Sequence, residues 1–167
     1  MTLAYIGLGS NMGDREACLG KAIDLMSKSA SVLSASSLYR TEPEGYKGQP
    51  DFLNSVICVD TGLDAEGLLK VLSGIESGMG RQRTFAGGPR VIDLDLLFYG
   101  GAIINQPGLE VPHPRMHLRA FVLVPMVEIA PGFIHPVLHK SMKELLAGLE
   151  PGYRVAKWVD NKDGGSG

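Results

Sequence analysis

Runs of apolar residues with two different periods divide the chain into predicted strands and helices. Short runs rich in apolar and β-branched residues, ending at glycine, proline or polar clusters, predict strands. These strands cover residues 2–10, 31–41, 52–62 and 91–99. Apolar residues that recur every three or four positions predict helices over residues 14–29 and 64–80, with Asp14 and Asp64 as their N-caps.

The last third of the chain has a weaker pattern. Short extended runs around Ile103 and Leu109 precede a turn and a helix. We expect this helix to be interrupted at Pro125, because proline lacks the N–H that a bond inside a helix needs. An amphipathic segment at 140–150 and an extended piece at 153–159 complete the ordered part, and the Gly/Ser-rich residues 161–167 predict a flexible polar tail.

The order of these elements predicts the fold class. Strands and helices follow one another as β, α, β, β, α, β, with hairpin-length gaps in places, which favours an α+β fold: a ferredoxin-like α/β sandwich with a largely antiparallel sheet. A parallel, doubly wound sheet is the alternative. At 167 residues the chain can close one sizeable core, so we expect a single domain over residues 1–160 followed by the tail.

Composition narrows the class of protein. The chain is 44% hydrophobic and 20% charged, without a signal-peptide pattern or a run of about eighteen apolar residues. We therefore expect a cytoplasmic protein with no membrane partner. The formal net charge of −2 creates no field that would collect nucleic acid, so none is expected. Cys18 and Cys58 are far apart, which excludes a redox pair and favours small buried hydrophobes. We also expect a monomer.

Two acids interrupt the apolar strand "VIDLDLLFY". Because side chains alternate along a strand, one face is predicted to carry Asp93, Asp95 and Leu97, and the other Ile92, Leu94, Leu96 and Phe98. Two hard carboxylates on one face, without neighbouring cysteine, favour Mg²⁺. A solvated strand face is the competing explanation for such a pair.

The segment before this strand favours a binding site over a solvated strand face. Arg81, Arg83 and Arg90 lie within the preceding dozen residues, in a stretch that also contains several glycines. Guanidinium groups hold phosphate oxygens in bidentate pairs, and metal-binding acids beside them are typical of nucleotide sites. The combination predicts phosphate chemistry by positioning and electrostatics rather than by a covalent intermediate.

Other motifs are less specific. "GLGSNMGD" fits neither a P-loop nor a dinucleotide fingerprint, so a tight strand-to-helix turn is favoured. Two histidine pairs with four-residue spacing would suit zinc on a helix, but intervening prolines argue against that helix. His113 is interpreted as a phosphate or hydroxyl partner, with an exposed loop histidine as the alternative. Phe52, Asn54 and Phe121 could together hold a flat heterocycle.

Several motifs in fixed order resemble one enzyme family. They are "AYIGLGSN", "SSLYRTEPEG", "QPDFLNSV", "GRQR", "GGPRVIDLDLLFYG" and "VPHPRMHLRAFVLVPMVEIAP", spread over residues 3–131. In this order they are similar to 6-hydroxymethyl-7,8-dihydropterin pyrophosphokinase of the folate pathway. The resemblance implies transfer of pyrophosphate from ATP to the hydroxymethyl oxygen of the pterin, with AMP as the second product.

The resemblance also assigns roles to individual residues. It implies two Mg²⁺ ions on Asp93 and Asp95, contacts from Arg81 and Arg90 to the phosphates, and Arg83 in a mobile lid. The nucleotide would lie near Glu76, His113 and Arg119. The pterin would lie between Phe52 and Phe121, with its edge against Asn54 and the backbone of the segment that holds Thr41, Glu42 and Glu44.

Two other classes of function compete with this one. A metal-dependent hydrolase could use the same acids, and would consume ATP without any pterin. A ferredoxin-like binding module without chemistry would have no use for acids beside an arginine-rich loop. Specific binding of Mg²⁺ and ATP would therefore argue against the module.

Overall fold

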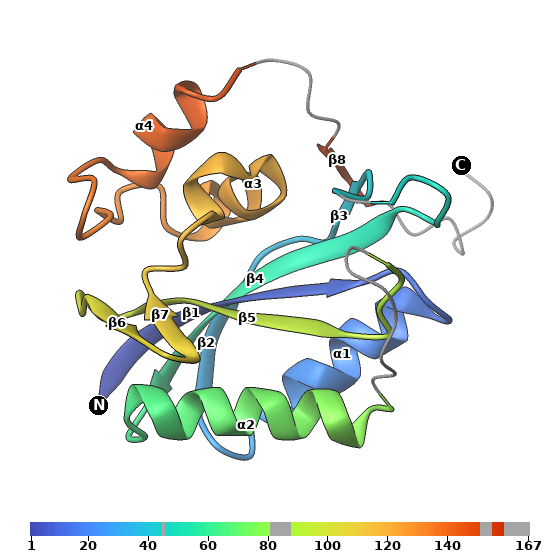
Figure 1. Ribbon diagram of the computed structural model, residues 1–167, viewed down its shortest axis with the longest axis horizontal. Helices are drawn as coiled ribbons and strands as arrows, with labels where there is room; N and C mark the ends of the chain where they lie inside the picture. The colour runs from blue at the N-terminus through green and yellow to red at the C-terminus, as the bar shows by residue number, and fades with distance from the viewer. Residues whose placement is uncertain (45, 81–87, 151–154, 159–167) are drawn as a thin grey trace.

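A six-stranded antiparallel sheet forms the centre of the protein (Figure 1). The computed structural model describes residues 1–44, 46–80, 88–150 and 155–158. The strands of this sheet are β1 (Thr2–Ser10), β2 (Ser31–Ala35), β3 (Tyr39–Thr41), β4 (Phe52–Thr61), β5 (Asp93–Tyr99) and β8 (Val155–Lys157). Their order is β5-β1-β4-β3-β8, with β2 also paired to β4.

The pairings confirm the predicted fold class. In the part of the chain that the structure describes, every strand pair of the sheet is antiparallel, as the ferredoxin-like sandwich requires and the doubly wound alternative does not. A separate hairpin joins β6 (Ile104–Gln106) to β7 (Leu109–Val111). None of the helices in the described ranges is both long and apolar enough to cross a membrane.

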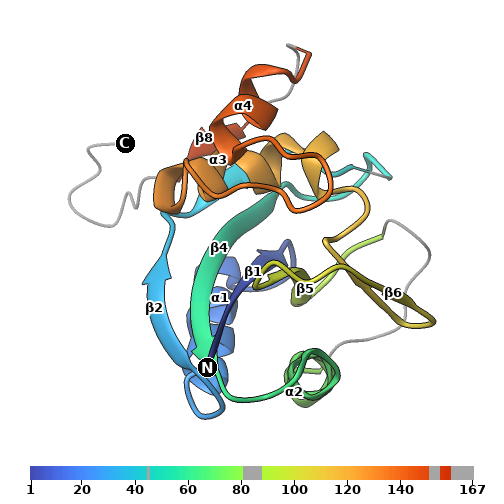
Figure 2. The ribbon, with the colours of Figure 1, turned by 90° about the vertical axis from the view of Figure 1, so that its left-hand side faces the viewer.

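Helices cover both faces of the sheet (Figure 2). One face carries α1 (Arg15–Met26) and α2 (Ala65–Gly78). Their predicted N-caps are confirmed, since Asp14 accepts a hydrogen bond from the Ala17 N–H and Asp64 accepts one from the Gly67 N–H. The other face carries α3 (Ala120–Ile129) and α4 (Met142–Ala147), preceded by the 3₁₀ turn η1 (Met116–Leu118).

The predicted strand over 31–41 is wrong in one respect, because it breaks into β2 and β3. At the break the Ser36 hydroxyl accepts the Val56 N–H and lies 3.0 Å from the hydroxyl of Ser55. A side-chain oxygen thus takes a bond that a backbone carbonyl would accept in a continuous ladder. The edge of the sheet bends here, and β3 is placed beside the end of β4.

Pro125 does not interrupt α3, contrary to the prediction. The helix runs over ten residues with Pro125 buried inside it. The proline costs the helix only the bond to the Phe121 carbonyl in its first turn. Burial of Val122, Leu123 and Met126 against the sheet compensates, because tertiary packing supplies most of the stability of a short helix.

A bulge at Leu97 divides the side chains of β5 between two hydrophobic cores. In the β1–β5 register Tyr5 faces Phe98 but Ile6 faces Leu96, so Leu97 is the extra residue. Leu96 packs in the core against α1 and α2, whereas Leu97 and Phe98 both pack in the core against α3 and α4. The prediction that Phe98 shares a face with Leu96 is therefore wrong, because strict alternation ends at the bulge.

One carboxylate ties α3 to β3 and to the residues just before it. Glu128 accepts hydrogen bonds from the backbone N–H of Ser37 at 3.0 Å, from the Ser37 hydroxyl at 2.8 Å and from the hydroxyl of Tyr39. Partial burial raises the pKa of Glu128, but the bonds from Tyr39 and Ser37 outweigh it and lower the pKa overall. Burial, together with the same contact, raises the pKa of Tyr39 to about 12. Glu128 therefore stabilises the fold in its charged form.

We expect Glu128→Gln to lower the free energy of unfolding at pH 7 by about 1 kcal/mol, because an amide accepts fewer hydrogen bonds than a carboxylate. A carboxyl group whose pKa is lower in the folded protein stabilises the fold at pH values above its unfolded pKa of about 4.3. This stabilisation is lost as the pH falls through the folded pKa. The difference between the two proteins should therefore shrink below pH 4 in thermal or urea unfolding. Glu110→Gln, at the exposed position of β7, is the control; a constant difference down to pH 3 would contradict the assignment.

Candidate functional site

A pocket of about 500 Å³ opens between the sheet and the N-terminal end of α3. Its floor comes from β1, β4 and β5, and one side comes from the first turn of α3 and from Arg115 and Arg119, which flank η1. The loop between β3 and β4 forms another side. The pocket lies on the α3 face of the sheet, opposite the core that α1 and α2 cover.

Two glycines of the central strand make the floor of the pocket. Gly9 lies opposite Asn54 on β4 and opposite Asp93 on β5, while Gly7 lies opposite Asp95. A Cβ atom on Gly9 would lie 2.7 Å from the Oδ1 atom of Asn54, which no real Cβ contact tolerates without movement. Because Gly7 and Gly9 carry no side chains, open space remains between the acids and Asn54.

Asp93 and Asp95 both line this pocket and are half-buried, so the prediction that they share a face is confirmed. Two carboxylates with no sulfur donor beside them fit a hard cation such as Mg²⁺. Among the described residues no group of three or more His, Cys, Asp or Glu side chains could hold a metal ion. A cation at this pair would therefore take its remaining ligands from water or from the oxygens of a bound substrate.

A buried amide and two aromatic rings form the apolar end of the pocket. Asn54 and Thr41 are almost fully buried, and the Asn54 amide donates to the Thr41 hydroxyl at 2.5 Å. Phe52 and Phe121 line the same space from β4 and α3. The arrangement offers two ring faces and hydrogen-bonding atoms at one edge, which suits a flat heterocycle.

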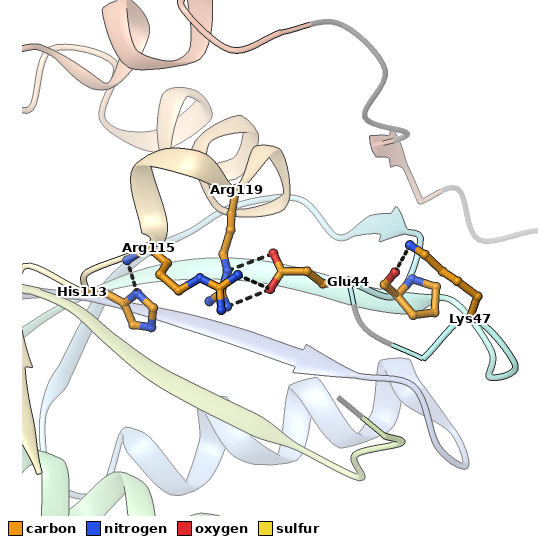
Figure 3. Close-up of polar contacts among 6 residues, drawn as sticks. Glu44, Lys47, His113, Arg115 and Arg119 are labelled. Atoms are coloured by element: carbon orange, nitrogen blue, oxygen red, sulfur yellow. Dashed lines mark hydrogen bonds and ion pairs between the residues drawn. The ribbon is translucent and has the colours of Figure 1, made fainter. Parts of the chain in front are cut away.

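Arginines line the α3 side of the pocket (Figure 3). The Arg119 guanidinium donates to both carboxylate oxygens of Glu44, from Nε at 3.1 Å and from Nη2 at 2.8 Å. Arg115 reaches the same carboxylate at 3.7 Å. The Arg119 guanidinium also lies 5.4 Å from the centre of the Phe121 ring. Two guanidinium groups are thus held in the lining of the pocket that also contains Asp93 and Asp95.

His113 is held in its neutral form beside the arginines. Its Nδ1 atom accepts the Arg115 N–H at 3.1 Å, and its own backbone N–H donates to the Leu97 carbonyl. Burial, followed by the charges of Arg119 and Arg115, lowers its pKa to about 4. His113 lies in the lining of a neighbouring cavity of about 320 Å³, which shares Asp95 with the main pocket.

Asn11 connects two loops that border the pocket. Its backbone and side chain pair with both backbone groups of Arg90, at 3.0 Å and 2.8 Å. Its amide also donates to the Gln49 side chain at 2.8 Å and to the Pro50 carbonyl at 3.0 Å. One buried amide at the end of β1 therefore holds the segment before β5 and the segment before β4 at a fixed separation.

The structure brings most of the predicted site residues into one pocket. Those that line it are Thr41, Glu42, Glu44, Phe52, Asn54, Arg90, Asp93, Asp95, Arg119 and Phe121. Glu76 is not among them: its carboxylate is buried under β5 and accepts the Leu94 N–H at 2.9 Å. Arg81 and Arg83, with residues 81–87 of the mobile lid expected over 79–88, lie outside the described residues.

Sequence reasoning missed two components of the pocket. The sequence pattern places Gly7 and Gly9 in a predicted strand and assigns them no role at a site, although a glycine inside a strand often marks close approach of a ligand. Arg115 is assigned no role by the pattern either. Its position beside Arg119 depends on η1, which the sequence did not predict.

Known proteins share both the sequence and the fold. The family model described as 7,8-dihydro-6-hydroxymethylpterin-pyrophosphokinase (HPPK) matches residues 5–131. A 2-amino-4-hydroxy-6-hydroxymethyldihydropteridine pyrophosphokinase of Methylorubrum extorquens is 44% identical over 90% of this chain and 96% of its own length. One from Bacillus subtilis is 45% identical over 76% of this chain and 77% of its own.

Longer relatives match over part of their length. The folic acid synthesis protein FOL1 of Dictyostelium discoideum is 41% identical, and the alignment covers 92% of this chain but 23% of the relative. A crystal structure of Plasmodium falciparum HPPK-DHPS wild type has a TM-score of 0.71 at 17% identity over 87% of this chain and 44% of that one, which supports the fold. The family model and the M. extorquens relative both span most of the chain, and the chain therefore belongs to the 7,8-dihydro-6-hydroxymethylpterin-pyrophosphokinase family.

Proposed function

We propose that this protein transfers pyrophosphate from ATP to 6-hydroxymethyl-7,8-dihydropterin, giving AMP and the pterin diphosphate in folate biosynthesis. The observation that carries the proposal is one pocket with an acid pair, an arginine pair and an aromatic–amide end, in a chain of this family. The hydroxymethyl oxygen would form a bond to the β-phosphorus as the bond between that phosphorus and the leaving AMP breaks.

The aromatic–amide end of the pocket would hold the pterin. Phe52 and Phe121 would contact the two faces of the ring, and Asn54 would pair with its edge. Thr41, Glu42 and Glu44 come from the loop that would complete this end. Held in this way, the hydroxymethyl oxygen can approach the phosphorus in line, an alignment that free water seldom reaches.

The charged end would hold the polyphosphate. Arg90 and Arg119 line the same pocket as the acids, and we add Arg81 and Arg83 to this set on the family resemblance. His113, neutral at pH 7 and in the neighbouring cavity, would complete the proposed nucleotide side. Glu76, buried beneath β5, would act there through the Leu94 backbone that it bonds. Asp93 and Asp95 would hold Mg²⁺, and we propose two ions. Bound there, Mg²⁺ would neutralise charge on the transferred group.

We also propose where the protein acts, its oligomeric state and its domain organisation. A small-molecule enzyme of folate synthesis fits a cytoplasmic monomer, with one domain over residues 1–160. The hydrolase and the binding module stay as competing functions. The hydrolase would use the same acids but would not need Phe52 and Asn54, so its products differ from those of the transferase.

The nucleotide product distinguishes these functions. Mixed with MgATP and 6-hydroxymethyl-7,8-dihydropterin, the protein should give AMP and the pterin diphosphate in equal amounts, measured by chromatography or phosphorus NMR. Little ATP should be consumed without the pterin, because water is not held in line. ADP with a pterin monophosphate would indicate an ordinary kinase. ADP and phosphate formed without the pterin would indicate a hydrolase.

Replacement of either acid by its isosteric amide should abolish turnover and spare the fold. Asp93→Asn or Asp95→Asn removes one carboxylate ligand, and the loss of cation binding should slow turnover by about a hundredfold or more. The unfolding temperature should not fall, since one of two neighbouring negative charges is removed. Asp24→Asn, on the exposed side of α1, is the control and should leave turnover unchanged. Near-normal turnover of both site variants at saturating Mg²⁺ would overturn the metal assignment.

The glycine floor gives a separate prediction for the pterin. In Gly9→Ala the new Cβ would lie 2.7 Å from Asn54 Oδ1 and 3.5 Å from the Phe52 ring, so the amide must move. The KM for the pterin should rise about tenfold or more, while the Kd for MgATP changes little. Gly20→Ala on α1, where nothing lies within 4 Å, is the matched control. An unchanged pterin KM in Gly9→Ala would remove Asn54 from the pterin site.

A further inference from the structure

The loop between β3 and β4 supplies an acid to the arginine side of the pocket. Both carboxylate oxygens of Glu44 accept bonds from Arg119, and Arg115 lies at 3.7 Å from one of them (Figure 3). Among the described residues, these ion pairs join the loop between β3 and β4 to the residues that precede α3. It links the proposed pterin side of the pocket to the proposed phosphate side.

The geometry of this cluster is that of an arginine with a bound oxyanion. A guanidinium presents a fork of N–H groups that matches two oxygens of a carboxylate or of a phosphate in the same way. The Nε and Nη2 donors of Arg119 are both directed at Glu44, at 3.1 Å and 2.8 Å. A phosphate that binds this edge of Arg119 bidentately must therefore replace Glu44.

The burial of the two partners indicates which of them moves. The Arg119 side chain is 16% exposed and is packed against Phe121, whereas the Glu44 side chain is 44% exposed. An exposed ion pair contributes little net stability, because water and salt compete with it. A polyphosphate carries several charges and can displace one such carboxylate at small cost, while Arg119 stays in place.

We propose that Glu44 is an internal competitor for the polyphosphate: it occupies Arg119 and Arg115 until the phosphates of the nucleotide replace it. The proposal rests on the proposed function, in which Arg119 contacts those phosphates. Glu44 is thus a positioning residue, which keeps the two guanidinium groups facing the pocket. Its displacement also releases one end of the loop between β3 and β4.

The contacts of the loop define how far this release extends. Lys47 donates to the Pro43 carbonyl, and the Gln49 amide donates to the Tyr46 carbonyl, so the loop is bonded to itself. Asn11 holds Gln49 and Pro50 from β1. Loss of the Glu44 contact therefore frees the beginning of the loop, near residues 42–44, whereas its end stays attached.

The first test measures binding of MgATP, without pterin, by calorimetry. Glu44→Gln removes the competing charge and should lower the Kd about two- to fivefold, the range expected for an exposed ion pair. Glu66→Gln, in the first turn of α2 and outside the pocket, is the matched control and should leave the Kd unchanged. An unchanged or raised Kd in Glu44→Gln would overturn the proposal.

A double-variant cycle separates competition from a general change of charge. In an Arg119→Gln background, Glu44→Gln should lower the Kd much less than in the wild type, since the contested partner is gone. If Glu44→Gln lowered the Kd equally in both backgrounds, the effect would come from the overall change of charge. That result would overturn the role of Glu44 as a competitor. Arg119→Gln alone should raise the Kd for MgATP. If it does not, then Arg119 does not contact the phosphates and the competition fails with it.

Hydrogen exchange gives a readout that charge alone would not move. MgATP should raise amide exchange at Glu42 and Glu44 of the wild type, because the phosphates release Glu44. Glu44→Gln should show the faster exchange already without nucleotide. Equal exchange in both proteins, with and without MgATP, would overturn the release of the loop, even if Arg119→Gln still weakens nucleotide binding and so supports the proposed function.

Discussion

The register of β1 between β4 and β5 is the constraint on which the pocket depends. One central strand pairs antiparallel with both neighbours, so a single residue, Gly9, is aligned with Asn54 on one side and with Asp93 on the other. A shift by one residue would turn every side chain to the opposite face and remove this alignment. The backbone hydrogen bonds of the sheet therefore set the separation between the proposed pterin end and the proposed metal end.

The bulge at Leu97 divides β5 into a part that faces the pocket and a part that packs in the core beside α3 and α4. Before it, Asp93 and Asp95 face the pocket while Leu94 and Leu96 face the core under α1 and α2. After it, Phe98 enters the other core, beside α3 and α4. One strand can thus present two charges to a pocket at one end and anchor α3, whose first residues line that pocket, at the other.

Charge is balanced inside the pocket before any ligand is bound. Two acids on β5 lie in the same cavity as Arg90, Arg115 and Arg119, and Glu44 neutralises part of the arginine charge. Burial, followed by the charges of Arg119 and Arg115, lowers the pKa of His113 and keeps it uncharged. Such a pocket holds its arginines in position before the ligand arrives. In the proposed exchange the phosphates replace the Glu44 carboxylate, so binding requires little rearrangement of the arginines.

The sequence by itself determined the fold class, the acid pair and most of the pocket lining, because period-two and period-3.6 patterns and local motifs such as "GGPRVIDLDLLFYG" report on neighbouring residues. It did not determine the break at Ser36, the continuation of α3 through Pro125, or the bulge that moves Phe98 to the other core. Each of these depends on partners far along the chain. Likewise, only the tertiary structure decided that Glu44 pairs with Arg119, since an ion pair across 75 residues leaves no periodic trace in the sequence.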